Sequence, residues 1–210
     1  MQTYSKEDLK QHLAEMGLEN TDAIMVHSSM KSIGNVEGVV RSLHPTHSIA
    51  AFGPAASEYI KGEENMTTPC QPGGCWERLR EVDAKILLVG VTHIRNTFIH
   101  AIEEIFDVPE RLTEQPTLFK IKMPDGTLKE VAMYRHYNRI LEHISESFDK
   151  MEEGYYKTGA AKKVRFGDAE CILCDAKRLV EVTEVILKQE PNCFIDREEI
   201  PEAWYEEFII

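Results

Sequence analysis

The stretch AKILLVGVTHIRNTFIHAIEE, residues 84–104, decides the fold class. Its first part, KILLVGV at residues 85–91, is apolar after Lys85, which is typical of a buried strand. The second part predicts a helix over 96–106, because apolar side chains recur on one helical face at Phe98, Ile102 and Phe106. A buried strand that leads directly into an amphipathic helix indicates a layered α/β domain.

The same alternation continues along the chain. A helix over 5–17 begins at Ser5, an N-cap followed by Asp8 three positions later. Residues 117–122 and 128–134 flank the turn sequence PDGT and predict a hairpin. The other expected elements are strands over 23–26, 48–52 and 171–173 and helices over 55–61, 137–151 and 176–188. The pattern predicts a single layered α/β domain over residues 1–210.

The composition is that of a folded, acidic protein. Hydrophobic content of 42% and charged content of 29% are ordinary for globular domains and argue against disorder. The 36 acidic residues outnumber the 24 basic ones, which gives a net charge of −12. That charge disfavours a nucleic-acid partner and favours cationic ligands.

Targeting signals are not expected from the sequence. No apolar run approaches the ~20 residues that span a bilayer, and the polar start MQTYSKEDLKQ does not resemble a signal peptide. The five cysteines, an odd number, are expected to be reduced thiols. We therefore expect a cytoplasmic protein without a membrane partner, and a homo-oligomer remains open.

The loop HSSMKSIG, residues 27–34, follows the first expected strand. Small hydroxyl residues and a glycine allow backbone donors to approach a phosphate closely. The candidate contacts are Ser28, Ser29, Ser32 and Gly34. The alternative is an ordinary polar turn, which is the commoner role of such loops.

A His-Pro pair occurs in RSLHPTHS, residues 41–48, before the second expected strand. Pro45 biases His44 toward extended backbone, so its ring can project sideways from a strand end. A neutral imidazole can accept a proton near physiological pH. A hydrogen-bonded structural histidine is the alternative at this position.

The helix over 96–106 carries polar groups along one side. Asn96, His100 and Glu103 lie on neighbouring turns and, together with Thr97, could line one cleft. Asn96 and Thr97 could instead be helix caps, and His100 and Glu103 a solvated pair.

Six segments resemble the aminoglycoside 3-N-acetyltransferase family and follow one another along the chain in the order found in that family. They span roughly residues 8–185, and RSLHPTHSIAAFGP and NTFIHAIEE are the most specific of them. The others are VHSSMKSIG, TPCQPGGCWERL, the Pro-Asp-Gly hairpin and VRFGDAECIL. The resemblance implies an α/β fold distinct from the common N-acetyltransferase fold.

The resemblance also implies a reaction. Acetyl-CoA would be the acetyl donor, and the 3-amino group of a 2-deoxystreptamine aminoglycoside, or a related amine, the acceptor, with direct transfer in a ternary complex. His44 would be the general base and Ser48 would position it. The acetyl-CoA contacts would be Ser28, Ser29, Ser32 and Gly34, and the substrate-binding residues Asn96, Thr97, His100 and Glu103. Antibiotic resistance is the function associated with such an activity.

One departure from the family pattern lies near residues 37–41. Family members have a helix, a strand and a loop between the Ser-rich loop and the His-Pro motif, whereas six residues, 35–40, stand here. We expect that a segment of on the order of fifty residues is absent from the numbered sequence. The alternative is a genuine deletion, which would remove a core strand.

Three other readings belong to different classes. Cys70, Cys75, Cys171 and Cys174 could form a four-thiolate zinc site, although i and i+3 on a strand point to opposite faces, and we expect no metal. Cys75 beside a histidine could form a covalent acetyl-enzyme. A non-catalytic protein that binds CoA or an antibiotic is the third. His12, His136 and His143 have no partnered motif and are interpreted as surface or structural residues.

Overall fold

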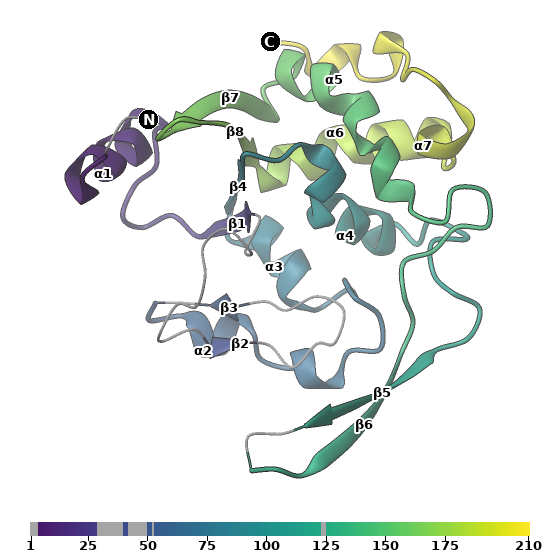
Figure 1. Ribbon diagram of the computed structural model, residues 1–210. Coiled ribbons are helices and arrows are strands. Elements are labelled where there is room, and N and C mark those ends of the chain that lie inside the picture. Colours follow the sequence, from purple (N-terminus) through teal and green to yellow (C-terminus); the bar gives the residue numbers. More distant parts are fainter. Residues whose placement is uncertain (1–3, 29–39, 42–49, 52, 123–124) are drawn as a thin grey trace.

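The computed structural model describes residues 4–28, 40–41, 50–51, 53–122 and 125–210 (Figure 1). The described strands and helices are interspersed along the chain, and helices pack against a central sheet. The predicted α/β fold class is confirmed. Its assignment to one domain over residues 1–210 remains a prediction.

Four of the described strands form the central sheet, in the order β1-β4-β8-β7. The strands are β1 (Ile24–Ser28), β4 (Lys85–Val89), β8 (Ala169–Asp175) and β7 (Ala161–Phe166). β1 and β4 are parallel, whereas β8 is antiparallel to both of its neighbours. The buried run predicted at 85–91 is therefore an inner strand, with Ile86 and Leu88 fully buried.

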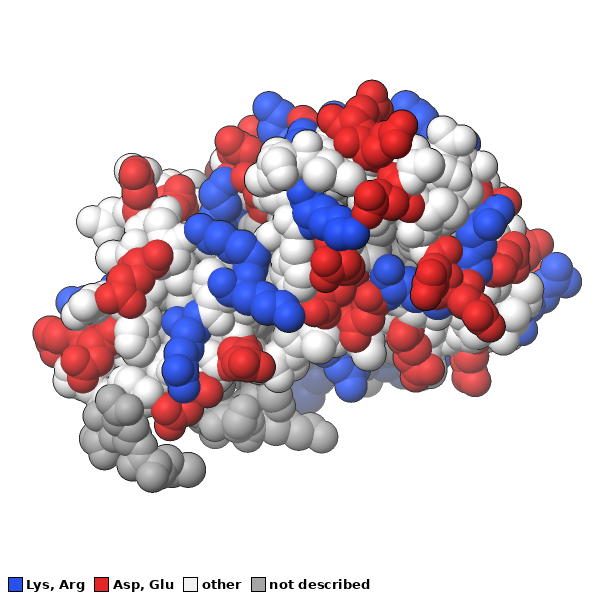
Figure 2. All heavy atoms as spheres, turned by 90° about the horizontal axis from the view of Figure 1, so that it is seen from above, with Lys and Arg blue, Asp and Glu red and all other residues white. Residues whose placement is uncertain are grey.

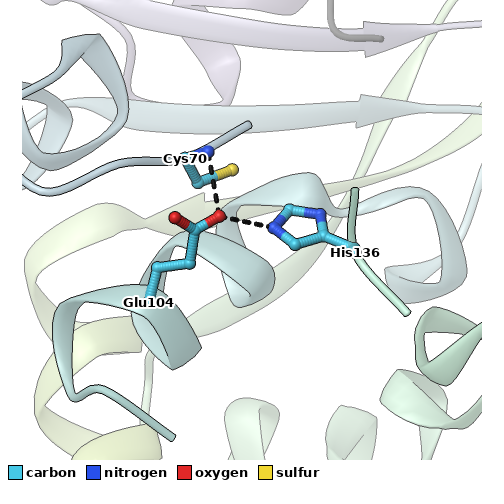
Figure 3. Close-up of side chains that lie close together, drawn as sticks. All are labelled: Cys70, Glu104 and His136. Atoms are coloured by element: carbon cyan, nitrogen blue, oxygen red, sulfur yellow. Dashed lines mark hydrogen bonds and ion pairs between the residues drawn. The ribbon is translucent and has the colours of Figure 1, made fainter. Parts of the chain in front are cut away.

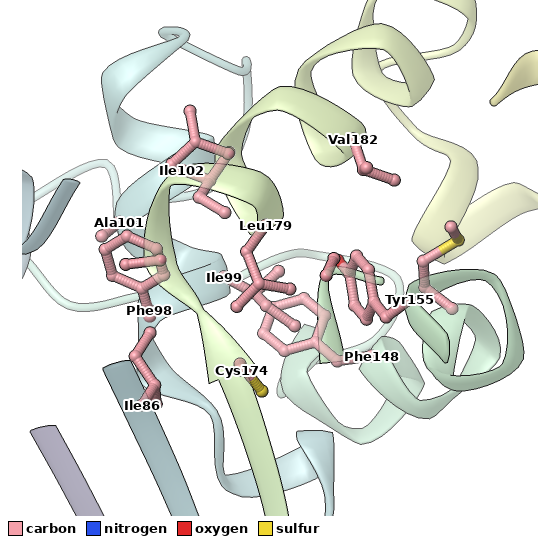
Figure 4. Close-up of a cluster of buried hydrophobic side chains, with 14 of the residues drawn as sticks. Ile86, Phe98, Ile99, Ala101, Ile102, Phe148, Tyr155, Cys174, Leu179 and Val182 are labelled. Carbon is pink, nitrogen blue, oxygen red and sulfur yellow. The ribbon is translucent and has the colours of Figure 1, made fainter. Parts of the chain in front are cut away.

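Helices α4 (Thr97–Ile105) and α6 (Ala176–Gln189) supply most of the core against this sheet (Figure 4). The apolar face of α4 meets Ile86 of β4 and Leu179 of α6 in one cluster. Helix α3 (Cys75–Glu81) adds Trp76 and Leu79 to the same core. Burial of these faces is what orients α4 relative to the end of β4.

Eleven further elements are described, apart from one hairpin. They are α1 (Lys6–Glu15), β2 (Val40–Arg41), β3 (Ala50–Ala51), α2 (Ala56–Tyr59), η2 (Glu63–Asn65), η3 (His93–Arg95), η4 (Ile144–Met151), α5 (Glu152–Lys157), α7 (Cys193–Asp196), η5 (Glu202–Trp204) and η6 (Glu206–Phe208). Within the described ranges, no helix has the length and apolar character needed to cross a membrane.

A two-stranded hairpin of β5 (Thr117–Lys122) and β6 (Leu128–Met133) projects from the body of the molecule (Figure 1). The turn sequence PDGT lies between the strands, as predicted. Asp125 accepts hydrogen bonds from the backbone and the hydroxyl group of Thr127, and Gly126 has a φ of 85°. An Asp side chain and a glycine in the left-handed region are what a tight turn requires.

Other elements also match their predictions. At α1, Ser5 and Asp8 form a reciprocal capping box. The helix predicted over 176–188 is α6, which begins after the capping residue Asp175. The strands predicted near 23–26 and 171–173 are β1 and β8, and the helix predicted over 96–106 is α4.

The helix predicted over 137–151 is wrong in its first half. Residues 137–143 are not helical, and a 3-10 helix, η4, occupies Ile144–Met151. The Asn138 side chain accepts hydrogen bonds from the backbone N–H groups of Ile140 and Leu141. This local turn competes with the helical hydrogen bonds that the apolar spacing implied.

Helix α3 and strand β7 are among the elements that lie where none was expected. Helix α3 begins at Cys75, whose N–H donates to the distant Glu63 carboxylate. β7 carries exposed charges as an edge strand and connects to β8 through a two-residue turn at Gly167 and Asp168. Neither a remote helix cap nor an edge strand gives a strong apolar pattern.

The short connection near residues 37–41 lies almost entirely outside the described residues. Val40 and Arg41 form β2, which pairs with β3, and the residues before and after them are not described. The absence of a segment there remains a prediction.

Candidate functional site

The carboxyl ends of β1 and β4 lie side by side. In the parallel register Ser28 is opposite Val89, so the loops that follow both strands leave from the same edge of the sheet. In α/β folds ligands commonly bind at such an edge. After β4 the chain turns at Gly90, whose φ is 63°, and passes through η3 into α4.

Three buried polar atoms lie near the end of β1 and on the segment between β4 and α4. His27 Nε2, His93 Nε2 and Asn96 Oδ1 have no hydrogen-bond partner within the described part of the chain. Burial lowers the pKa of both His27 and His93 to about 4, so both rings are neutral at physiological pH. Because buried polar groups are normally paired, this edge offers binding capacity for a polar ligand or for another segment of the chain.

The first charged network on α4 centres on Glu103. Its Oε1 accepts from Arg111 Nε at 2.7 Å, and its Oε2 lies 2.9 Å from His100 Nδ1. Burial, then the charge of the neighbouring His136, lowers the pKa of His100 against the opposing effect of Glu103. Arg111 also donates to the carbonyl oxygens of Pro109 and Pro191. The network thereby connects α4 to the segment after α6.

The next residue, Glu104, has a different set of partners. Its Oε1 lies 2.6 Å from His136 Nε2 and accepts from the Cys70 N–H at 3.0 Å. Its Oε2 accepts from the Thr68 hydroxyl group in a short hydrogen bond. Figure 3 shows Cys70, Glu104 and His136 facing one another.

The two networks meet at a pair of histidine rings. His100 and His136 stack with their centroids 4.0 Å apart, and Phe148 packs edge-on against His100. The imidazoles of His100 and His136 and the two carboxylates of α4 are therefore held within one partly buried cluster. This arrangement could orient ligands, share protons or hold a cation.

A groove of about 880 Å³ adjoins the same strand end. Residues 90–92 line it together with β7, β8 and α5. Lys163 and Arg165 contribute positive charge, and Glu152 and Glu170 negative charge. On the face shown in Figure 2, Lys and Arg side chains gather near the middle with Asp and Glu around them.

Comparison with known proteins identifies the family. The profile of the aminoglycoside 3-N-acetyltransferase family matches residues 35–188, well over half of the chain. The chain belongs to the aminoglycoside 3-N-acetyltransferase family.

Named members of this family are a little over one quarter identical to the chain within the aligned stretches. It is 27% identical over 157 residues to aminoglycoside N(3)-acetyltransferase IV of Salmonella sp. This aligned stretch covers 75% of the chain and 56% of that relative. It is 28% identical over 145 residues to aminoglycoside N(3)-acetyltransferase IX of Micromonospora chalcea, and this aligned stretch covers 66% of the chain and 51% of that relative. The chain thus spans about half the length of the curated relatives it matches.

Solved structures of family members share the fold. The apoenzyme of aminoglycoside acetyltransferase AAC(3)-IVa superposes with a TM-score of 0.73 at 21% identity, covering 100% of this chain and 99% of that one. A histidine-to-alanine mutant of the same enzyme in complex with a gentamicin gives 0.71 at 22%, covering 99% and 97%. AAC-IIIb in its binary complex with CoASH gives 0.71 at 17%, covering 89% and 97%. At these identities the likeness establishes the fold alone.

The second family motif, on α4, is fully described. Asn96 is at the N-cap position, but its side chain makes no capping hydrogen bond. Instead, Asn96 Nδ2 lies 3.2 Å from His93 Nδ1. Thr97 is half-buried at the first position of the helix. The alternative of a solvated pair is wrong, because His100 is 8% exposed and Glu103 is fully buried.

The His-Pro motif and most of the Ser-rich loop fall outside the described residues. This applies to His44, Ser48, Ser29, Ser32 and Gly34. Ser28 ends β1, and its side chain is likewise not described. The roles of these residues remain predictions.

The structure bears on the two hypotheses that assign a role to cysteines, the four-thiolate zinc site and the covalent acetyl-enzyme at Cys75. All five thiols are buried. Among the described residues the potential metal ligands that converge are Cys70, Glu104 and His136, so the four-thiolate arrangement does not form. Burial and the nearby Glu63 raise the pKa of Cys75, which disfavours it as a nucleophile.

His136 is one of the residues whose contacts the sequence interpretation missed. It follows the β5–β6 hairpin with no motif around it, and it meets Glu104 across 32 residues of chain. Only the fold brings the two together, and no local signal could have revealed the contact.

Proposed function

We propose that this chain is an acyltransferase. It transfers the acetyl group of acetyl-CoA to the 3-amino group of a 2-deoxystreptamine aminoglycoside or a related amine. The observation that carries the proposal is the family match over residues 35–188, which contains both the His-Pro motif and α4. The names of the relatives and the CoA and gentamicin complexes of the solved family members support it.

In the proposed reaction the neutral amine attacks the thioester carbonyl within a ternary complex. His44 accepts the amine proton, the carbon–sulfur bond breaks, and the departing CoA thiolate takes the proton back from His44 and leaves as the thiol. Ser48 closes the His-Pro motif and positions His44. No covalent acetyl-enzyme is formed, which agrees with the raised pKa of the Cys75 thiol.

Acetyl-CoA binds at the carboxyl end of β1 in this proposal. Ser28, Ser29, Ser32 and Gly34 contact it, with backbone donors of the loop available to the phosphates. The position of Ser28 at the edge shared with β4 supports this arrangement.

The acceptor amine binds beside α4. Asn96, Thr97, His100 and Glu103 line this part of the site, and Asn96 Oδ1 is the buried acceptor that lacks a partner within the described ranges. Both oxygens of Glu103 are engaged by His100 and Arg111, so Glu103 acts mainly through the histidine it orients. The net charge of −12 favours a polycationic acceptor.

Mass spectrometry of the product tests the proposal. The chain is incubated with acetyl-CoA and a panel of aminoglycosides, and a drug that gains one acetyl group confirms the transfer. His44→Ala should lose most turnover, on the order of 10²-fold or more for a general base. His47→Ala is the matched control, because His47 occupies a variable position of the same motif and should retain activity. A fully active His44→Ala protein would contradict the assignment of the base.

The second candidate is a family member that binds CoA or an antibiotic without turnover. Two observations favour it: the six-residue connection over 35–40 and the match to only about half of the curated relatives' length. Saturable binding of acetyl-CoA without acetylation of any drug would support it over the acyltransferase.

The short connection itself has a direct test. We propose that a segment is absent from the numbered sequence near residues 37–41. The sequence as numbered has a mass of 24.0 kDa, and about fifty further residues would add roughly 6 kDa. The intact mass of protein expressed from the native gene decides between an absent segment and a genuine deletion.

A further inference from the structure

Three side chains with different metal-binding groups converge beside α4. Cys70 lies in the loop before α3, Glu104 on α4 and His136 after β6, and their ligand atoms all lie within 4.8 Å of one another (Figure 3). We propose that Cys70, Glu104 and His136 form a binding site for one divalent metal ion of the zinc class. This site is distinct from the His44 motif and departs from the metal-free protein expected from the sequence.

The donor set fits that class of ion. Zinc accepts thiolate sulfur, imidazole nitrogen and carboxylate oxygen, whereas calcium and magnesium require oxygen ligands almost alone. Bond lengths of roughly 2.0–2.3 Å in a tetrahedral site place ligand atoms less than about 4 Å apart. Movements of roughly 1 Å would therefore bring these side chains to the bonding distances of such an ion.

The surroundings hold the ligands in place. The side chains of Glu104 and His136 are only 5% and 9% exposed, and Cys70 is 1% exposed. The Thr68 hydroxyl group and the Cys70 N–H both donate to the Glu104 carboxylate. Secondary hydrogen bonds of this kind orient ligating carboxylates in metal sites.

Charge balance also favours a dication. A thiolate and a carboxylate with a neutral imidazole carry two negative charges, so a divalent ion makes the buried site neutral. Burying charge is costly unless it is paired in this way. Three protein ligands leave a fourth position open to water or another ligand.

Protons compete with the metal at Cys70. A cysteine thiol has an ordinary pKa of about 8.5, so a metal-free thiol is protonated near neutral pH. Metal binding must displace that proton, because the thiolate is the ligand. Binding should weaken as pH falls and should release at least one proton per ion.

Cobalt titration provides the test. Tag-free full-length protein is reduced, stripped with a chelator and titrated with Co²⁺, whose thiolate complexes show a near-ultraviolet charge-transfer band. We expect one cobalt per chain with this band, its loss on addition of Zn²⁺, and release of a proton during the titration. A folded wild-type protein that develops no thiolate band would overturn the proposal.

Variants assign the ligands. Cys70→Ser and His136→Gln should lose the band, and Thr68→Val should weaken binding about tenfold. Cys171→Ser is the matched control: Cys171 is also buried, and a serine hydroxyl group can keep its bond to the Ala169 carbonyl. A band that persists in Cys70→Ser contradicts the site.

Folding of each variant is checked by far-ultraviolet circular dichroism. If Cys70→Ser does not fold, the wild-type stoichiometry and proton release decide the question, since a site without a thiolate releases no thiol proton and gives no band. Acetyl transfer is measured separately, so failure of the metal site leaves the proposed reaction untouched, and the converse also holds.

Discussion

Helix α4 and the β5–β6 hairpin are both marked clearly in the sequence, yet they differ in what holds them. Six of the nine residues of α4 are buried, and its charged side chains reach partners up to 36 residues away. The hairpin is stabilised mainly by its own strand pairing, and it exposes Leu118 and Leu128 by 61% and 68%. A two-stranded hairpin by itself is only marginally stable in water.

The hairpin and α4 therefore differ in whether nearby or distant residues determine their contacts. Turn chemistry and local pairing suffice to define the hairpin, whereas the charged networks of α4 depend on contacts between distant segments. Substitutions should therefore have large effects in the α4 networks and small effects on the outer face of the hairpin.

Loss of Arg111 should have the largest effect. Arg111→Met leaves the fully buried Glu103 carboxylate without its cation and removes donors to Pro109 and Pro191. Breaking a buried pair in this way costs about 3–5 kcal/mol. Urea denaturation measures it, and Arg139→Met is the control, because the Arg139–Glu110 pair is exposed. Equal losses of unfolding free energy in Arg111→Met and Arg139→Met would contradict the greater importance of the buried α4 network.

A pH dependence should follow from His93. Burial lowers its pKa from 6.5 to about 4, so the unfolded chain binds a proton more readily than the native protein between these values. Stability from this residue is therefore present above pH 6.5 and is lost as pH falls, by roughly 3 kcal/mol near pH 4. His93→Gln should flatten the fall of unfolding free energy between pH 6.5 and 4. An unchanged slope would show that the ring is solvated in solution.

The Thr68 hydroxyl group should contribute less. Thr68→Val keeps the shape of the side chain but removes one donor from Glu104. A hydrogen bond to a charged group is worth roughly 1.5–3 kcal/mol, and the two donors that remain on Oε1 should limit the loss to the lower end. Chemical denaturation in the absence of metal measures this value, and Thr117→Val on the hairpin serves for comparison.

The smallest effect is expected at Leu118. Leu118→Thr keeps β-propensity on the exposed face of the hairpin and should change the unfolding free energy by less than about 0.5 kcal/mol. Thermal denaturation at several protein concentrations measures it. A loss well above about 1 kcal/mol that depends on concentration would mean that this face is covered in solution.

Local patterns anticipated much of the fold for identifiable reasons. The capping box of α1, the buried run of β4 and the hairpin turn each depend on residues within a few positions of one another. The helix expected over 137–151 failed because one side chain, Asn138, takes over two backbone donors. Such competition is invisible to apolar periodicity.

The candidate site shows the same limit. The α4 motif was located from the sequence, and two of its polar side chains, His100 and Glu103, contact each other; that the four residues line one cleft stays a prediction. The partners of that motif were not predicted: Arg111, His136, Cys70 and Thr68 reach Glu103 and Glu104 only through the packing of separate segments. Their spacing along the chain carries no periodic signal.

The strand order of the sheet has a consequence for biosynthesis. β8 lies between β4 and β7, so β4 gains its antiparallel neighbour only after residue 175 has been made. Until then the apolar segment KILLV is paired at most with β1 while it leaves the ribosome. Exposed apolar strands that await distant partners fold slowly and tend to aggregate. Recovery of soluble protein should therefore depend on translation speed and on chaperones that shield nascent chains.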